Sequence, residues 1–90
     1  MTSVTTSDIN EAVTTLKAGN CISLIASGAG WGDTELFEII KCIAAGFGRN
    51  LITLKLDGNN FSTEALSVLC RIIGTANVAR ANIQNIPNPQ

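Results

Sequence analysis

Leu-Ile-Thr-Leu-Lys-Leu-Asp-Gly-Asn-Asn-Phe, residues 51 to 61, has a related copy about 30 residues earlier in the chain. That copy is Cys-Ile-Ser-Leu-Ile-Ala-Ser-Gly-Ala-Gly-Trp, residues 21 to 31, and an amphipathic run follows each of the two. Residues 21–43 and 51–73 are therefore two units of one pattern. A period of this length is typical of repeat architectures, so the repeat predicts two structural units of the same kind.

Each unit has the pattern of a strand, a turn and a helix. Residues 51–56 are aliphatic and β-branched, and the turn-forming cluster 57–60 ends them. In the second unit, a helix is expected to start at Ser62 and Thr63. In the first unit, residues 22–26 are expected to form a strand, and a helix is expected to start near Asp33. The apolar residues expected to face inward from the second helix are Leu66, Leu69, Cys70 and Ile73. Two such units in series predict an α/β fold with parallel strands and helices on one face of the sheet.

The pattern extends beyond both units at an offset of about 27 residues. Upstream, Val4 aligns with Trp31 and Ile9 with Leu36, which predicts a helix that starts at Ser7-Asp8 and has no strand of its own. Downstream, Val78, Ala81 and Ile83 fit strand positions, so a third strand is expected near residues 78–83. The chain is expected to form one domain over residues 1–84, and a loose tail is expected at 85–90, where Pro87 and Pro89 end regular structure.

Composition limits the classes of partner. The net charge is −1, 46% of the residues are hydrophobic, and the six basic residues are scattered along the sequence. No basic cluster indicates nucleic acid or an anionic lipid surface, and no apolar run is long enough to cross a membrane. The first residues lack a secretory signal, so a reducing, cytoplasmic location is expected.

The inventory of reactive side chains argues against catalysis. There is no histidine and no tyrosine, and no cysteine or carboxylate cluster has metal-ligand spacing. Cys21, Cys42 and Cys70 fall at apolar positions of the repeat and are expected to be buried free thiols. The sequence therefore predicts a protein that is not an enzyme and has no cofactor and no metal.

Two other motifs have structural interpretations. Gly28-Ala29-Gly30 before a helix has some likeness to a phosphate-binding turn, but the third glycine and the acidic residue of the dinucleotide fingerprint are missing. A tight turn after a strand is the favoured interpretation. Trp31 aligns with Phe61, so both aromatic rings are expected to fill the space between strand and helix.

The segment from Leu51 to Asn59 matches L-x-x-L-x-L-x-x-N and resembles a leucine-rich repeat, and the full helix is similar to the ribonuclease-inhibitor-like subfamily. The resemblance implies a short solenoid of about two and a half repeats, in which Leu51, Leu54 and Leu56 point into the core. It also implies that the Asn59 side chain bonds to backbone groups of the turn and forms a ladder between repeats. The first unit departs from this motif at three positions, which are Cys21, Ala26 and Ala29.

Side chains that alternate with the core leucines are expected to point away from the helices. This strand face is where leucine-rich repeats usually meet partners, so the resemblance implies a protein-protein interaction module that binds through this face or associates with itself. A merely solvated face is the open alternative. The candidate partner-binding residues are Ser23, Ile25, Ser27, Thr53, Lys55 and Asp57.

A rival interpretation is a small regulatory α/β domain. Residues 56–63, followed by a helix, resemble the loop of the anti-sigma-factor antagonists, with Ser62 or Thr63 as the phosphate acceptor. Strand order separates the two hypotheses: sequential parallel neighbours favour the repeat protein, and a mixed sheet favours the regulatory domain.

Overall fold

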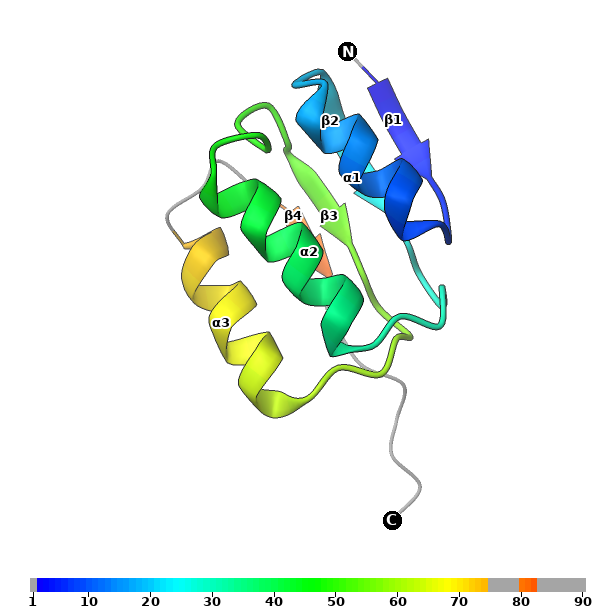
Figure 1. Cartoon of the computed structure of the whole chain (residues 1–90), viewed down its shortest axis with the longest axis vertical. Helices are drawn as coiled ribbons and strands as arrows, with labels where there is room; N and C mark the ends of the chain where they lie inside the picture. Colours follow the sequence, from blue (N-terminus) through cyan, green and yellow to red (C-terminus); the bar gives the residue numbers. More distant parts are fainter. Residues whose placement is uncertain (1, 75–79, 83–90) are drawn as a thin grey trace.

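Strands and helices alternate along the whole described chain (Figure 1). The computed structural model describes residues 2–74 and 80–82, with side chains up to residue 74. The predicted tail at 85–90 lies outside these residues. In chain order the elements are β1 (Thr2–Thr5), α1 (Ile9–Lys17), β2 (Cys21–Ile25), α2 (Asp33–Ala44), β3 (Thr53–Lys55), α3 (Thr63–Ile73) and β4 (Arg80–Asn82).

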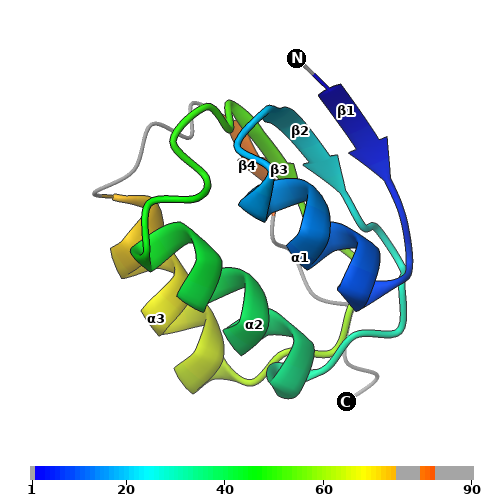
Figure 2. The same cartoon turned by 45° about the horizontal axis from the view of Figure 1, so that its top comes forward.

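The strands form one open sheet in the order β1-β2-β3-β4, and all neighbours are parallel. The three helices lie side by side over one face of this sheet, with α2 between α1 and α3 (Figures 1 and 2). The predicted α/β architecture with parallel strands and one helical layer is confirmed at this level. None of the described helices is both long and apolar enough to span a membrane.

The strand register follows the offsets found in the sequence. Each β3 residue pairs with the β2 residue thirty positions before it, as Leu54 does with Leu24. The strand predicted near residues 78–83 is β4, whose Ala81 pairs with Leu54 at the shorter offset. Val78 and Ile83, the other two residues of that prediction, lie outside the described residues.

The prediction that the first helix has no strand of its own is wrong. Residues Thr2–Thr5 form β1, and Val4 pairs with Leu24 in the sheet instead of corresponding to Trp31. The reason is the length of the connection: only residues 6–8 separate β1 from α1, whereas residues 26–32 separate β2 from α2. An alignment that matches the helices therefore places the strand too late.

The predicted helix starts are confirmed by their capping contacts. The Asp8 carboxylate accepts a hydrogen bond from the Asn10 backbone N–H at 2.9 Å, and the Ser62 hydroxyl accepts one from Ala65 at 3.1 Å. At α2, the Glu35 side chain accepts a hydrogen bond from Gly32 N–H at 2.8 Å. Each contact satisfies a backbone donor that the helix itself leaves unpaired.

The core lies between the sheet and the helices and contains the strand positions predicted from the repeat. Leu51, Leu54 and Leu56 are fully buried, and their counterparts in the first unit are the buried residues Cys21, Leu24 and Ala26. Trp31 and Phe61 are also buried, as predicted, and the Trp31 indole Nε1 donates a hydrogen bond to the Ser7 carbonyl at 3.0 Å. This bond ties the loop before α1 to the loop before α2.

One of the three cysteine predictions is wrong. Cys21 and Cys42 are buried free thiols, and burial raises the pKa of each above its ordinary value. Cys70 is also free, but it is exposed on α3. The apolar pattern located Cys70 on the side of the helix that a further helix would cover, and no described helix covers it.

Asn59 connects the two units. Its side chain is fully buried, and its Nδ2 group donates hydrogen bonds to the carbonyls of Leu56 at 2.9 Å and Ala26 at 2.8 Å. Its Oδ1 accepts a hydrogen bond from Trp31 N–H at 3.0 Å. These are the bonds within the turn and between units that the resemblance implied for Asn59.

Replacement of Asn59 with alanine should destabilise the fold by about 3 kcal/mol, because two carbonyls and one N–H group lose their partner in a buried position. Chemical denaturation gives this free energy. The matched control is Asn60→Ala at the exposed neighbouring position, which should change stability by less than about 0.5 kcal/mol. Equal effects of the two substitutions would contradict the role assigned to Asn59.

Candidate functional site

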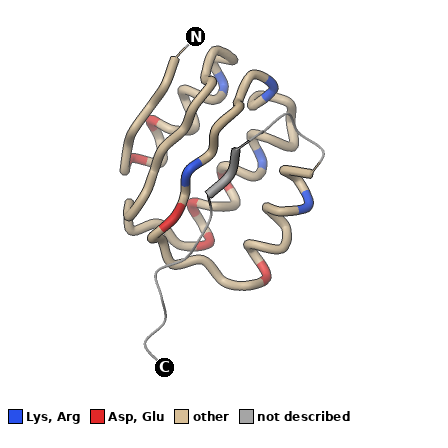
Figure 3. Tube along the Cα trace, turned by 180° about the vertical axis from the view of Figure 1, so that it is seen from behind, with Lys and Arg blue, Asp and Glu red and all other residues tan. Residues whose placement is uncertain are grey.

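The face of the sheet opposite the helices is not covered by any described element (Figures 2 and 3). Burial alternates along β2 and β3: Leu24 and Leu54 are fully buried, whereas Ser23, Ile25 and Lys55 are partly exposed. Successive side chains of a strand point to opposite faces, so the partly exposed residues lie on the side without helices. This surface, called the open sheet face below, comprises Ser3, Thr5, Ser23, Ile25, Ser27, Thr53, Lys55 and Asp57.

Strand pairing brings the sequence-predicted site residues together in rows. Ser23 is paired with Thr53, and Ile25 is paired with Lys55. Ser27 and Asp57 follow the ends of β2 and β3 and meet in the next row, where the Ser27 hydroxyl donates a hydrogen bond to the Asp57 carboxylate at 2.6 Å. All six predicted residues therefore form one continuous patch on β2, β3 and the turns that follow them.

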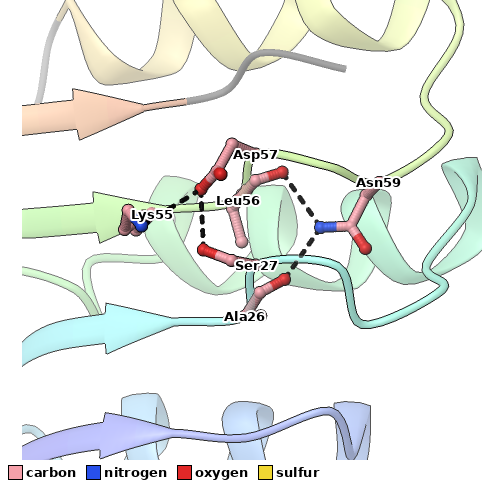
Figure 4. Close-up of polar contacts among 6 residues, drawn as sticks. All are labelled: Ala26, Ser27, Lys55, Leu56, Asp57 and Asn59. Atoms are coloured by element: carbon pink, nitrogen blue, oxygen red, sulfur yellow. Dashed lines mark hydrogen bonds and ion pairs between the residues drawn. The ribbon is translucent and has the colours of Figure 1, made fainter. Parts of the chain in front are cut away.

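The charged groups of the patch are paired with each other (Figure 4). The Lys55 ammonium lies 3.7 Å from the Asp57 carboxylate, which also accepts the Ser27 hydrogen bond. The Ser27 hydrogen bond lowers the pKa of Asp57 below its ordinary value, and the Lys55 charge contributes a smaller part in the same direction. The eight residues named above thus present hydroxyls, one aliphatic side chain and a compensated ion pair, and these residues have no net charge together.

Sequence reasoning missed the contribution of β1 to this face. Ser3 is paired with Ser23 and Thr5 with Ile25, and both residues of β1 are exposed. The alternation Ser3-Val4-Thr5 was the available signal, because it places one apolar side chain between two hydroxyls. It is too short to predict a strand without knowledge of the register.

A shallow hollow of about 320 Å³ lies where β1 and β2 end. Ile25 and Ser27 of the open sheet face form part of its lining, so the hollow is continuous with that face. The remaining lining residues are Thr5, Thr6, Ser7, Ala26, Gly28 and Ala29. Gly28, which lines the hollow, and Gly30, two residues later, adopt positive φ angles of 61° and 77°. Such angles are expected for the tight turn predicted after β2.

The comparisons with known proteins add no relative. No protein-family model, no curated protein and no solved structure matches the chain. Function is therefore inferred from the residues and their geometry.

The pairing of Ser27 with Asp57 predicts a pH dependence. The folded-state pKa of Asp57 lies below its ordinary value of 3.8, so the carboxylate stabilises the fold above about that pH, and the contribution is lost as the pH falls through the lower, folded-state pKa. Replacement of Ser27 with alanine should move the Asp57 pKa back toward 3.8, as measured by carboxyl NMR titration.

Ser23→Ala is the control, since Ser23 lies on the same face and its hydroxyl is not bonded to Asp57. An Asp57 pKa that is the same in the Ser27→Ala variant and in the wild type would refute the assignment of the shift to this hydrogen bond.

Proposed function

We propose that the chain is a short leucine-rich-repeat-like solenoid that serves as a non-catalytic protein-protein interaction module. In this proposal the chain binds another protein through its open sheet face or associates with itself. The proposal involves no cofactor, no metal, no nucleic acid and no membrane. A reducing, cytoplasmic location fits three cysteines that are all free.

The observation that carries the proposal is the bridge made by Asn59. The Asn59 amide joins the Leu56 carbonyl of its own turn to the Ala26 carbonyl of the preceding unit, thirty residues before Leu56. A buried asparagine that joins equivalent backbone positions of neighbouring units is what the leucine-rich-repeat resemblance implies. The purely parallel sheet with strands in sequential order is the arrangement that this resemblance requires.

The chemistry of the open sheet face favours a protein over other ligands. Lys55, the cation of the predicted patch, is paired with Asp57, so the patch has no unpaired positive charge for a nucleic-acid backbone. The hollow beside it is shallow and open, unlike the enclosed pockets that bury small ligands. Hydroxyls around Ile25 offer both hydrogen bonds and an apolar contact, a mixture that is typical of protein interfaces.

The regulatory-domain alternative is less favoured by the geometry. Strand order is sequential and parallel, which is the result expected of a repeat protein. At the candidate phosphate acceptor, the Ser62 backbone N–H already donates a hydrogen bond to the Asp33 carboxylate at 2.8 Å. A phosphate on Ser62 would therefore lie beside a negative charge, which opposes its addition.

The test is affinity capture with a double variant of the open sheet face, Ile25→Asp with Lys55→Glu. Partners that bind this face should be captured at least about tenfold less well, a loss that corresponds to about 1.4 kcal/mol. The matched control is Phe37→Asp with Lys41→Glu, which makes one apolar-to-acidic and one basic-to-acidic change at exposed positions of α2. Quantitative mass spectrometry compares the captured proteins, and circular dichroism checks that both variants are folded.

If every partner is captured equally by the wild type and by the Ile25→Asp, Lys55→Glu variant, the open sheet face is not the binding surface. A loss caused by the α2 control variant alone would move the interface to the helical side.

A further inference from the structure

The turn after β3 contains an aspartate that is followed directly by glycine. Of the three aspartates in the sequence, Asp57 alone has this neighbour, whereas Asp8 and Asp33 precede β-branched residues. A β-branched side chain crowds the backbone nitrogen of its own residue, but glycine leaves that nitrogen open to reaction. The bond between Asp57 and Gly58 is therefore the place where a backbone nitrogen can best attack a neighbouring aspartate side chain.

Such an attack converts aspartate to isoaspartate through a cyclic imide. The Gly58 nitrogen bonds to Cγ of Asp57, and the amide hydrogen and the carboxyl hydroxyl leave as water. Water then adds to one of the two ring carbonyls. Addition at Cγ restores aspartate, whereas addition at the main-chain carbonyl carbon breaks its bond to nitrogen and leaves the main chain running through Cγ. The water that is released is taken up again, so the conversion consumes no other reactant.

The fold requires glycine at position 58. The φ angle of Gly58 is +75°, and a Cβ atom on this residue would lie 3.3 Å from the backbone nitrogen of Gly28. Other residues rarely adopt this backbone conformation, and their side chains would press against the turn of the preceding unit. A bulkier residue therefore cannot shield the Asp57 carboxyl group, and protection has to come from contacts of Asp57 itself.

Two groups of Asp57 are held by the preceding unit. The Ser27 hydroxyl donates a hydrogen bond to the Asp57 carboxylate at 2.6 Å (Figure 4), and the Gly28 N–H donates one to the Asp57 carbonyl at 2.8 Å. These contacts restrict the rotations that bring Cγ onto the Gly58 nitrogen. The Ser27 hydrogen bond also favours the ionised carboxylate, which is a poor electrophile, and so lowers the pKa of Asp57.

We propose that Asp57-Gly58 is a site of spontaneous isoaspartate formation, and that the Ser27 hydroxyl keeps this reaction slow in the folded chain. Isoaspartate adds one carbon to the main chain directly before Gly58. The added carbon moves Asn59 relative to the two carbonyls that its amide binds, so the modification breaks the bridge between the two units. This inference is independent of partner binding by the open sheet face.

Peptide mapping of the folded full chain, aged at mildly acidic pH and physiological temperature, tests the proposal. Trypsin cleaves after Lys55 and Arg71 and so releases the turn in one peptide, in which electron-transfer fragmentation distinguishes isoaspartate from aspartate. The Ser27→Ala variant should form isoaspartate about tenfold faster than the wild type, which corresponds to a barrier lower by about 1.4 kcal/mol. Ser27 is exposed, so its replacement leaves the core intact.

Four controls isolate the hydroxyl. Ser27→Thr keeps a hydroxyl and should react as slowly as the wild type. Ser23→Ala should do the same, because the Ser23 hydroxyl lies on the same face and is not bonded to Asp57. Asp57→Glu should give no isomerised peptide. In urea, the wild type and Ser27→Ala should react at the same high rate, because the hydrogen bond exists only in the folded chain.

Equal rates for the folded wild type and Ser27→Ala overturn the proposal. A Ser27→Thr variant that reacts as fast as Ser27→Ala also overturns it, since the hydroxyl would then give no protection. Isoaspartate that accumulates at Asp8 or Asp33 in place of Asp57 overturns the choice of site. The purified isoaspartyl chain should unfold at a lower denaturant concentration than the unmodified chain, and an unchanged midpoint would contradict the predicted effect on Asn59.

Discussion

The fold depends on a single buried amide that holds two consecutive turns at a fixed distance. Asn59 has no access to solvent, and its three hydrogen bonds reach the carbonyls of Leu56 and Ala26 and the N–H of Trp31. A buried amide is costly unless it is fully bonded, so the unit that contains Ala26 and Trp31 has one favourable position relative to the unit that contains Asn59. The other contacts between the turns follow from that position: the Asn60 N–H donates to the Trp31 carbonyl at 3.0 Å, and Ser27 reaches Asp57.

The strand order explains why the candidate site lies on a face instead of in a crevice. Strands that are added in sequence, with every helix on the same side, produce a sheet whose order never reverses among the described strands. Open α/β sheets usually bind ligands where the strand order reverses and helices change sides, and such a position is missing from β1 to β4. What remains exposed is a broad surface of alternate strand residues, among which Ser23, Thr53 and Lys55 stand in fixed rows.

The features that the two units share could be predicted from the sequence, whereas the strand at one edge of the sheet and the exposure of the last helix could not. The pairing of Leu24 with Leu54, and of Leu54 with Ala81, could be predicted because core positions require apolar side chains in every unit. The open sheet face followed from strand alternation. The strand at Thr2–Thr5 was missed because an edge strand of this length needs only one apolar residue, Val4. Cys70 was misplaced because periodicity shows which side of a helix is apolar, but not whether a neighbour covers it.

The two exposed surfaces differ in how well they tolerate water. On the open sheet face, Ser27 and Lys55 are bonded to Asp57, so their polar groups are satisfied in the unbound chain and binding there has to replace good hydration. The free energy of any contact through the sheet face therefore depends on how well a partner reproduces the hydrogen bonds of water. The apolar side of α3 differs, because Leu66 and Ile73 are partly exposed there and their further burial would remove apolar surface from water.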